Sequence, residues 1–337
     1  MNYYRSRDGE ASMNTGKNYF VEHVSSFDAL SGVTEQAGPF IECSPELFKR
    51  LNAPHEKVII CHRPDAAAEA NAIAVGIILR GRLNSSLFVS VLRPITDVAA
   101  FWSVLRGFCE TSRIGGLSIE VIVGSDEEID IKLFPETDDI VTSDLFLVDV
   151  FKEDLRFSSN HRRNINKARK SGIHLIEQPI EAAIADHFRL RDNSFDRRAA
   201  RGEAIIESDP MRYISTDHAK IWQCGLDGEV TTSNLIVFGL DGAWHYESAG
   251  TSPEGFKLGS SQFLHVEIME AARKAGIRWY DLGGGAPNNP GLVRFKEGFA
   301  THRWKKVEFF YDLSPFWIRQ VEKARSLASA AVGLLRG

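Results

Sequence analysis

The feature that most constrains the fold is a pair of Asp-Gly dipeptides, each set between apolar runs in the second half of the chain. They are Asp227-Gly228 and Asp241-Gly242, and they separate the runs 221–226, 230–240 and 243–249. Asp-Gly readily adopts the two positive φ angles that a tight two-residue hairpin turn requires. The sequence therefore predicts a three-stranded antiparallel meander in this region.

A helix and a further strand are expected directly after the meander. Apolar residues recur at helical spacing through 261–274, with Ser260 or Ser261 as the N-cap and Gly276 as the stop. The apolar run 277–282 is then the next strand. The order of elements in this half is three strands, a helix and a strand.

The first half of the chain shows the same order of elements. Strands are expected at 57–62, 72–83 and 86–92, a helix at about 97–112, and a strand at 117–123. Repetition of an order of elements without sequence identity argues for two similar domains packed together. The boundary is expected near the acidic, turn-prone stretch 135–144.

The two ends of the chain lie outside this repeated pattern. Residues 1–18 are polar, with no apolar run that could be a signal peptide or a membrane span, so a flexible tail is expected. Residues 314–337 predict an amphipathic helix with Trp317 and Val321 on its apolar side. Docking across the domains is its expected role, and lying on a membrane surface is the alternative.

The composition is that of an ordinary globular protein. With 337 residues, 43% of them hydrophobic and 25% charged, the chain is long enough for two cores, and disorder throughout is excluded. A net charge of -5 neither indicates nor excludes nucleic acid. The cysteines show no CxxC spacing and are expected to be reduced, mostly buried thiols of a cytosolic protein without a metal site. They are Cys43, Cys61, Cys109 and Cys224.

Residues 279–299 run from an apolar strand through a glycine-rich turn to a single lysine, Lys296. Glycines after a strand, here 283–285, let the backbone approach a ligand closely. Phe295 and Phe299 flank the lysine, and such surroundings amplify the field of its charge. An ammonium placed there can stabilise a developing oxyanion. The alternative is a surface lysine on a short helix.

Two further charged residues belong to this segment. Asp281 interrupts the apolar run 279–282, and a carboxylate on a central strand must be paired or functional. It is expected to pair with Lys296 or to orient an acceptor amine. Arg294 is either a phosphate ligand or a salt-bridge partner of Glu297.

Residues 158–172 predict a strongly basic surface helix with a serine cap, a glycine stop and only Ile165 and Ala168 as apolar anchors. One interpretation is a solvated face. The other is a helix that recognises phosphate, because arginine side chains match phosphate geometry. The basic residues are Arg162, Arg163, Lys167, Arg169 and Lys170.

The loop between the meander and the helix at 261–274 is a candidate anion site. Backbone N–H groups at a helix N-terminus bind phosphate, and Gly259 with two serines offers a reduced version of such a cradle. A plain N-cap is the alternative. His245 and His265 are expected to be hydrogen-bonded core histidines. The pair Ser260-Ser261 lacks a nucleophile elbow and no Ser-His-Asp order stands out, so covalent catalysis is not expected.

These motifs resemble the FemAB-type acyltransferases, a branch of the GNAT-like fold. The matching residues are Tyr280-Asp281-Leu282-Gly283-Gly284, Gly291-Leu292, Phe295-Lys296 and Gly298-Phe299, together with Asn164-Ile165, Ala168 and Gly172 after two basic residues. The resemblance implies an α+β protein with tandem GNAT-like domains of the acyl-CoA N-acyltransferase type. Each domain would have a mixed, mostly antiparallel sheet with helices on both faces. Residues 19–140 would form a non-catalytic wall, and residues 141–313 would hold the active cleft.

The resemblance also implies transfer of an acyl or aminoacyl group to an amine of a cell-envelope precursor or sugar, in the cytoplasm or at the inner face of the membrane. The donor would be aminoacyl-tRNA or acyl-CoA, the acceptor a small-molecule or lipid-linked amine, and neither a metal nor an obligate protein partner is implied. The alternatives are an acyl-CoA-dependent enzyme acting on a small metabolite or nucleotide sugar, and a non-catalytic binding module. The implied catalytic residues are Lys296, Asp281 and Phe295, and the implied substrate- and phosphate-binding residues are Arg162, Arg163, Lys167, Lys257, Gly259, Ser260, Ser261, Tyr246, Gly283, Gly284 and Arg294.

Overall fold

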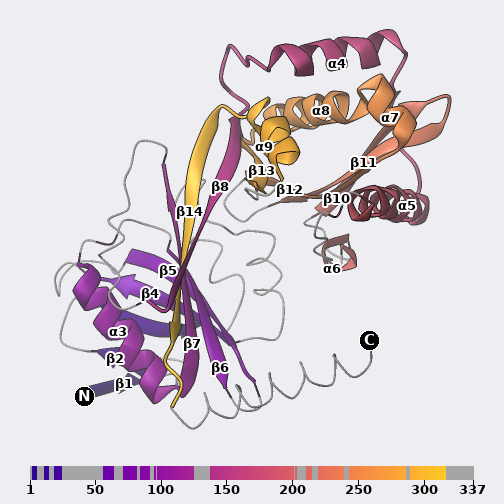
Figure 1. Ribbon diagram of the computed structural model, residues 1–337. Helices are drawn as coiled ribbons and strands as arrows, with labels where there is room; N and C mark the ends of the chain where they lie inside the picture. The colour runs from indigo at the N-terminus through magenta and orange to yellow at the C-terminus, as the bar shows by residue number, and fades with distance from the viewer. Residues whose placement is uncertain are drawn as a thin grey trace, which may run out of the picture.

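The computed structural model is a single extended sheet with helices packed on it (Figure 1). The order of its strands is β1-β2-β3-β4-β5-β6-β7-β14-β8-β13-β12-β11-β10-β9. The structure describes residues 2–5, 11–14, 19–24, 56–63, 71–81, 84–91, 95, 97–124, 137–200, 202, 210–214, 219–238, 243–285 and 289–315.

The first half of the chain contains the expected three strands, helix and strand as its last five elements, and three further strands precede them. Its elements are β1 (Asn2–Arg5), β2 (Ala11–Asn14), β3 (Tyr19–Val24), β4 (Glu56–His62), β5 (Asn71–Leu79), β6 (Ser85–Val91), α3 (Val98–Thr111) and β7 (Ile114–Val123). Strands β3 to β6 are antiparallel neighbours, whereas β6 and β7 are parallel. Helix α3 begins where the Asp97 side chain accepts a hydrogen bond from the Ala100 amide at 2.9 Å.

The second half repeats that order. Its elements are β8 (Asp139–Asp149), α4 (Ser159–Lys170), β9 (His174–Leu175), α5 (Ile180–Ala199), α6 (Met211–Ile214), β10 (Ala219–Leu226), β11 (Glu229–Phe238), β12 (Ala243–Thr251), α7 (Pro253–Leu258), α8 (Ser260–Lys274), β13 (Trp279–Gly285), α9 (Pro290–Glu297) and β14 (His302–Asp312). The meander β10-β11-β12 is confirmed, with φ angles of 53° at Asp227 and 81° at Gly228. The second Asp-Gly pair lies outside the described residues.

Each half buries its own core, as expected from the length of the chain. In the first half, Phe101, Leu105 and Phe108 of α3 pack on the sheet. In the second half, α8 packs on one face of the sheet, and α5 packs on the other (Figure 1). Full burial of a large apolar side chain stabilises the fold by about 1.5–3 kcal/mol. This packing holds α8 against the face of the sheet on which the candidate site lies.

Strands β8 and β14 run side by side between the two halves (Figure 1). Strand β14 pairs with β7 from Lys305↔Val123 to Asp312↔Gly116 and with β8 along its other edge. The boundary expected at 135–144 therefore falls partly within a strand. Hydrogen bonding of the last strand to the first half could not be predicted from local patterns, because it joins residues almost 200 positions apart.

The flexible tail expected at 1–18 is wrong for residues 2–5 and 11–14, which form β1 and β2. The edge of β3 offers unpaired backbone groups that a further strand can satisfy, and Tyr3 and Tyr4 are favourable strand residues. The helix expected at 314–337 lies outside the described residues beyond 315. Among the helices that the structure describes, none has the length and hydropathy needed to cross a membrane.

Candidate active site where strands β12 and β13 separate

Strands β12 and β13 begin as a parallel pair and then separate. They pair only at Ala243↔Trp279, Trp244↔Tyr280 and His245↔Asp281, although β12 continues to Thr251 and β13 to Gly285. We call the region beyond the His245↔Asp281 rung the fork. In the first half, the matching strands β6 and β7 stay paired as far as Ser90↔Glu120, so they show no comparable fork over the described residues of β6.

Two register shifts accompany the fork. On β12, Tyr246 lies opposite Ile236 and Ser248 opposite Leu235, so Glu247 is the extra residue of a bulge. On β13, the pairing with β8 shifts between Asp281 and Gly284. Bulges bend strands and change their twist, and they recur next to active sites. Because both strands bend just after their last shared rung, they diverge.

Lys296 reaches the fork from α9. That helix is capped by Asn289, whose side chain accepts a hydrogen bond from the Leu292 amide at 3.1 Å. The Lys296 side chain is only 6% exposed, and its Nζ donates to the Gly284 carbonyl oxygen at 2.6 Å. A Cβ built on Gly283 would lie 3.4 Å from Nζ and 3.9 Å from the Tyr246 carbonyl oxygen. The amino group therefore lies between β12 and β13, and the alternative of a surface lysine is wrong.

Burial controls the charge of Lys296. It lowers the pKa of the ammonium to about 8, against the attraction of the Asp281 carboxylate, which raises the pKa. At neutral pH the side chain is still mostly a cation. A buried cation with three N–H donors, one of them used by Gly284, can stabilise negative charge that develops on a neighbouring oxygen.

Asp281 was expected to pair with Lys296 or to orient an acceptor amine; its carboxylate attracts the Lys296 ammonium, but its hydrogen bonds go to other groups. Its Oδ2 lies 2.9 Å from His245 Nδ1, and its Oδ1 accepts from the Gly283 amide at 2.6 Å. The reason is register: His245 and Asp281 form the last rung of the parallel pair, so their side chains meet on one face. His245 is thus a buried, hydrogen-bonded histidine, as expected.

Neutral histidines and aromatic rings line the α8 side of the fork. Burial lowers the pKa of His265 to about 3 and lowers that of His161. His265 Nδ1 lies 2.7 Å from the Tyr280 hydroxyl, and its ring meets that of Tyr246 edge-on. The Phe295 ring packs against both histidines, and its carbonyl oxygen lies 2.8 Å from His161 Nε2. Such apolar surroundings strengthen the field of the lysine.

His161 was not among the residues expected at the site. The sequence does contain a signal for it, because His161, Ile165 and Ala168 share one helical stripe and are the buried residues of α4. The basic character of the segment masked that stripe. The predicted serine cap is confirmed, since the Ser158 hydroxyl accepts from the His161 amide at 3.2 Å.

Helix α4 presents its cations to solvent and its backbone to α8. Arg162, Arg163 and Lys167 are exposed. Gly259 has a φ of 80°, and a Cβ there would lie 2.5 Å from the Asn164 carbonyl oxygen. The basic helix and the start of α8 are therefore in direct contact.

The predicted serine N-cap of α8 is wrong. The N-cap is Gly259, and no side chain caps the helix. Ser260 is fully buried, and its hydroxyl accepts from Thr231 Oγ1 at 3.0 Å, so its side chain is engaged inside the protein. Ser261 is half-buried in the first turn. The bulge on β11 that carries Thr231 was not visible in the sequence.

Two of the basic residues predicted to bind substrate or phosphate lie on the surface. Lys257 of α7 is exposed and pairs with Glu254 at 3.6 Å. Arg294 is exposed, and Glu297 accepts from Arg303 at 2.9 Å instead of pairing with Arg294. The alternative role of Arg294 as a phosphate ligand stays a prediction.

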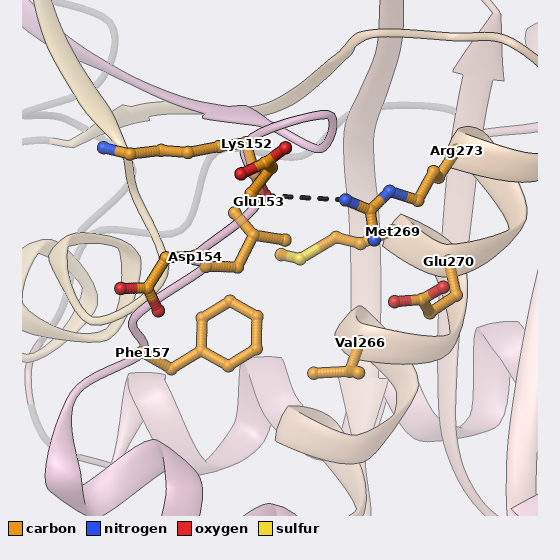
Figure 2. A pocket seen from close by; sticks show the side chains of 9 residues that line it. Lys152, Glu153, Asp154, Phe157, Val266, Met269, Glu270 and Arg273 are labelled. Atoms are coloured by element: carbon orange, nitrogen blue, oxygen red, sulfur yellow. Dashed lines mark hydrogen bonds between the residues drawn. The ribbon is translucent and has the colours of Figure 1, made fainter.

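A surface pocket on the outer side of α8 is separate from the fork. Figure 2 shows Phe157, Val266 and Met269 at its floor, with the Arg273 side chain reaching across toward the Lys152 backbone. Its volume is about 290 Å³. None of the residues expected at the active site lines it, and charged side chains of both signs surround it. The fork, with its buried cation, is the stronger candidate.

The described cysteines are free and buried, as expected. Cys61, Cys109 and Cys224 are buried free thiols, and Cys43 lies outside the described residues. Within the described ranges, no group of three His, Cys, Asp or Glu side chains is arranged to hold a metal ion.

Known proteins share this architecture. Residues 156–297 match the family model described as an acetyltransferase (GNAT) domain. The crystal structure of FemX, 12% identical, matches with a TM-score of 0.66 over 87% of this chain and 97% of that one. A conserved protein of unknown function from Bacteroides thetaiotaomicron, 10% identical, matches with a TM-score of 0.53 over 84% of this chain and 95% of that one. No curated protein matches the sequence.

Proposed function

We propose that this chain transfers an acyl or aminoacyl group to an amine at the fork of the second domain, because residues 156–297 match the acetyltransferase (GNAT) domain model and the fold resembles that of FemX. The observation that carries the proposal is the Lys296 amino group, buried between two separating strands. The ladder between β12 and β13 ends at His245↔Asp281, and the backbone groups of β12 beyond this rung border the fork. They are suited to hold an extended donor by main-chain hydrogen bonds.

In the proposed reaction, the acceptor amine attacks the carbonyl carbon of an ester or thioester. A C–N bond forms while the carbonyl π electrons move to oxygen, and Lys296 stabilises that oxyanion by a charged hydrogen bond. When the intermediate collapses, the C–O or C–S bond of the donor breaks, and the amine proton passes to the leaving group through solvent. Direct attack needs positioning and oxyanion support and no protein nucleophile.

The phosphate-bearing part of the substrate is proposed to bind where α4 meets α8. Arg162, Arg163 and Lys167 supply exposed cations there, and the start of α8 lacks a side-chain cap. The Asn164 carbonyl oxygen lies against Gly259, where a coenzyme A pyrophosphate would need N–H donors. The loop before α8 has only Gly259 and two serines in place of the glycine-rich loop expected of a coenzyme A binder, so aminoacyl-tRNA is the proposed donor.

The acceptor is proposed to be an amine of a cell-envelope precursor or sugar, either small or lipid-linked, with the first domain as a wall of the site. The runner-up is acyl-CoA-dependent acylation of a small metabolite or nucleotide sugar. It would gain support if the α4–α8 junction bound coenzyme A.

The test is to incubate the purified protein with radiolabelled aminoacyl-tRNA or acetyl-CoA and a panel of amine acceptors. We expect label to pass from the tRNA to an amine, with stable amide product. Transfer from acetyl-CoA alone would establish the runner-up. Transfer from neither donor, in a folded protein that binds neither, would contradict the proposed reaction.

A further inference from the structure

We propose that Asp281, held by His245, is a positioning residue that fixes the Gly283 turn and thereby keeps the Lys296 amino group between β12 and β13. The proposal rests on the proposed function only for its kinetic consequences. Its structural part concerns the chain itself. Asp281 and His245 act here through other groups and do not touch the reacting atoms.

Asp281 ties together the two strands at the point where they separate. Its Oδ2 lies 2.9 Å from His245 Nδ1 on β12, and its Oδ1 accepts from the Gly283 amide on β13 at 2.6 Å. Asp281 is 7% exposed and His245 is 4% exposed, so water competes little with these bonds. A carboxylate with two such partners holds one orientation.

The turn fixed by Asp281 leads directly to the lysine. Gly283 has a φ of 75°, a conformation that glycine adopts without strain, and it lies in the bulge between Asp281 and Gly284. The carbonyl of the next residue, Gly284, is the hydrogen-bond partner of Lys296 Nζ at 2.6 Å. A change in the Gly283 turn would therefore displace the acceptor that anchors the amino group.

The electrostatic link is equally specific. Among the described residues, Asp281 on β13 and His265 on α8 interact electrostatically with Lys296, and His161 on α4 interacts with His265. Burial lowers the pKa of both histidines, so they are neutral at neutral pH. Asp281 is then the nearby carboxylate that favours the ammonium form of Lys296. Glu297 is next in sequence but points outward to Arg303.

The test is an NMR titration of the Lys296 side chain in the full-length protein without substrates. The protein is labelled with carbon-13 at lysine Cε, and Lys296→Arg identifies the signal. The variants are Asp281→Asn, which removes the charge, His245→Leu, which removes the hydrogen-bond partner, and His245→Asn, which keeps an N–H donor near the Nδ1 position. Glu297→Gln is the matched control, because it removes an exposed carboxylate beside Lys296.

We expect Lys296 to titrate near 8 in the unaltered protein, at lower pH in Asp281→Asn, and unchanged in Glu297→Gln. Turnover should fall by about 100-fold in His245→Leu with an unchanged KM for the donor, and His245→Asn should restore most of it. Equal titration in Asp281→Asn and the unaltered protein, or full turnover in His245→Leu, would overturn the proposal. If His245→Leu fails to fold, the Asp281→Asn titration alone decides. That titration needs no activity, so it fails or succeeds independently of the proposed reaction.

Discussion

At the scale of single residues, Lys296 is held in a place that is unfavourable for a cation. Lys296→Met removes the charge and keeps the length of the side chain. We expect turnover to fall by about 100- to 1000-fold, as for the loss of other oxyanion donors. The measurement is kcat, compared with that of Lys305→Met, which removes a lysine from β14.

The stability of the same variant should not fall at neutral pH. Below pH 8 the amino group is protonated in both folded and unfolded chains, so the folded state bears the full cost of burying the charge. As pH rises from 8 toward 10.5, the folded protein releases this proton first and gains stability relative to the unfolded chain. The melting temperature of Lys296→Met should thus match or exceed that of the unaltered protein at pH 7, with the difference shifting in favour of the lysine at higher pH. A marked loss of stability at pH 7 would show that Lys296 is structural.

The pH dependence of turnover separates two roles for Lys296. If the ammonium stabilises an oxyanion, kcat must fall as pH rises through about 8, because the cation is lost. If the neutral amine acts as a base, kcat must rise over the same range. We predict the fall, measured in the unaltered protein with saturating donor. A rise through this range would reassign Lys296 as a base.

The sequence indicated the residue types at the site better than their environments. Flanking by Phe295 and Phe299 pointed to Lys296, but its burial depends on how α9 returns over the fork. The hydrogen bond between Asp281 and His245 was not predicted, because His245 lies 36 positions away and meets Asp281 only through the parallel register of two strands. Contacts of this kind follow from topology and leave no local pattern.

At the scale of elements, helix α4 is proposed to bind the phosphate groups of the substrate. If Arg162 and Arg163 hold phosphate, then replacing both by Ser raises KM for the phosphate-bearing substrate with little change in kcat. The defect should shrink as salt rises, because salt screens exposed charges. The double variant Arg106→Ser, Arg113→Ser, on the first domain, is the matched control. Unchanged kinetics in the α4 variant would show that the basic side chains of this helix are only solvated and do not bind substrate.

The contact between α4 and α8 can be probed at a glycine. Gly259→Ala places a Cβ 2.5 Å from the Asn164 carbonyl oxygen and also strains a φ of 80°. Gly276→Ala strains a similar φ of 78° but meets nothing within 4 Å. The Gly276→Ala control should lose only the cost of the strained φ angle, about 1–2 kcal/mol of unfolding free energy. Chemical denaturation measures this loss. Gly259→Ala should lose more and bind the phosphate-bearing substrate more weakly. Equal losses of stability in the two variants would show that α4 shifts away from a Cβ at residue 259 at little energetic cost.

The meander and the fork differ in how far the sequence could predict them. Asp227-Gly228 fixes a hairpin through its own backbone conformation, so β10 and β11 were predictable from neighbouring residues. The fork depends on bulges at Glu247 and near Gly283, and these arise from the pairing of β12 and β13 with different neighbours. The predicted serine N-cap of α8 was wrong for a similar reason, because Ser260 is hydrogen-bonded to Thr231 of β11.

At the scale of the whole molecule, one sheet joins two domains, and only the second is proposed to carry out the reaction. The repeated order of elements was visible in the sequence, but the insertion of β14 between β7 and β8 was not. The parallel strands of the first domain remain paired to Ser90↔Glu120, and Ser90 Oγ donates to Glu120 there. The corresponding strands of the second domain separate after His245↔Asp281. This asymmetry is the basis for assigning the chemistry to the second domain.

The most direct test of that assignment is a crystal structure with a non-hydrolysable aminoacyl-nucleotide analogue, and in parallel with a coenzyme A thioether. We predict density for the acyl carbonyl in the fork, between β12 beyond Tyr246 and the Gly283 turn, with its oxygen within hydrogen-bond distance of Lys296 Nζ. The phosphate groups should lie near Gly259 and Arg163. Density at the first-domain pair β6 and β7, with the fork empty, would contradict the account.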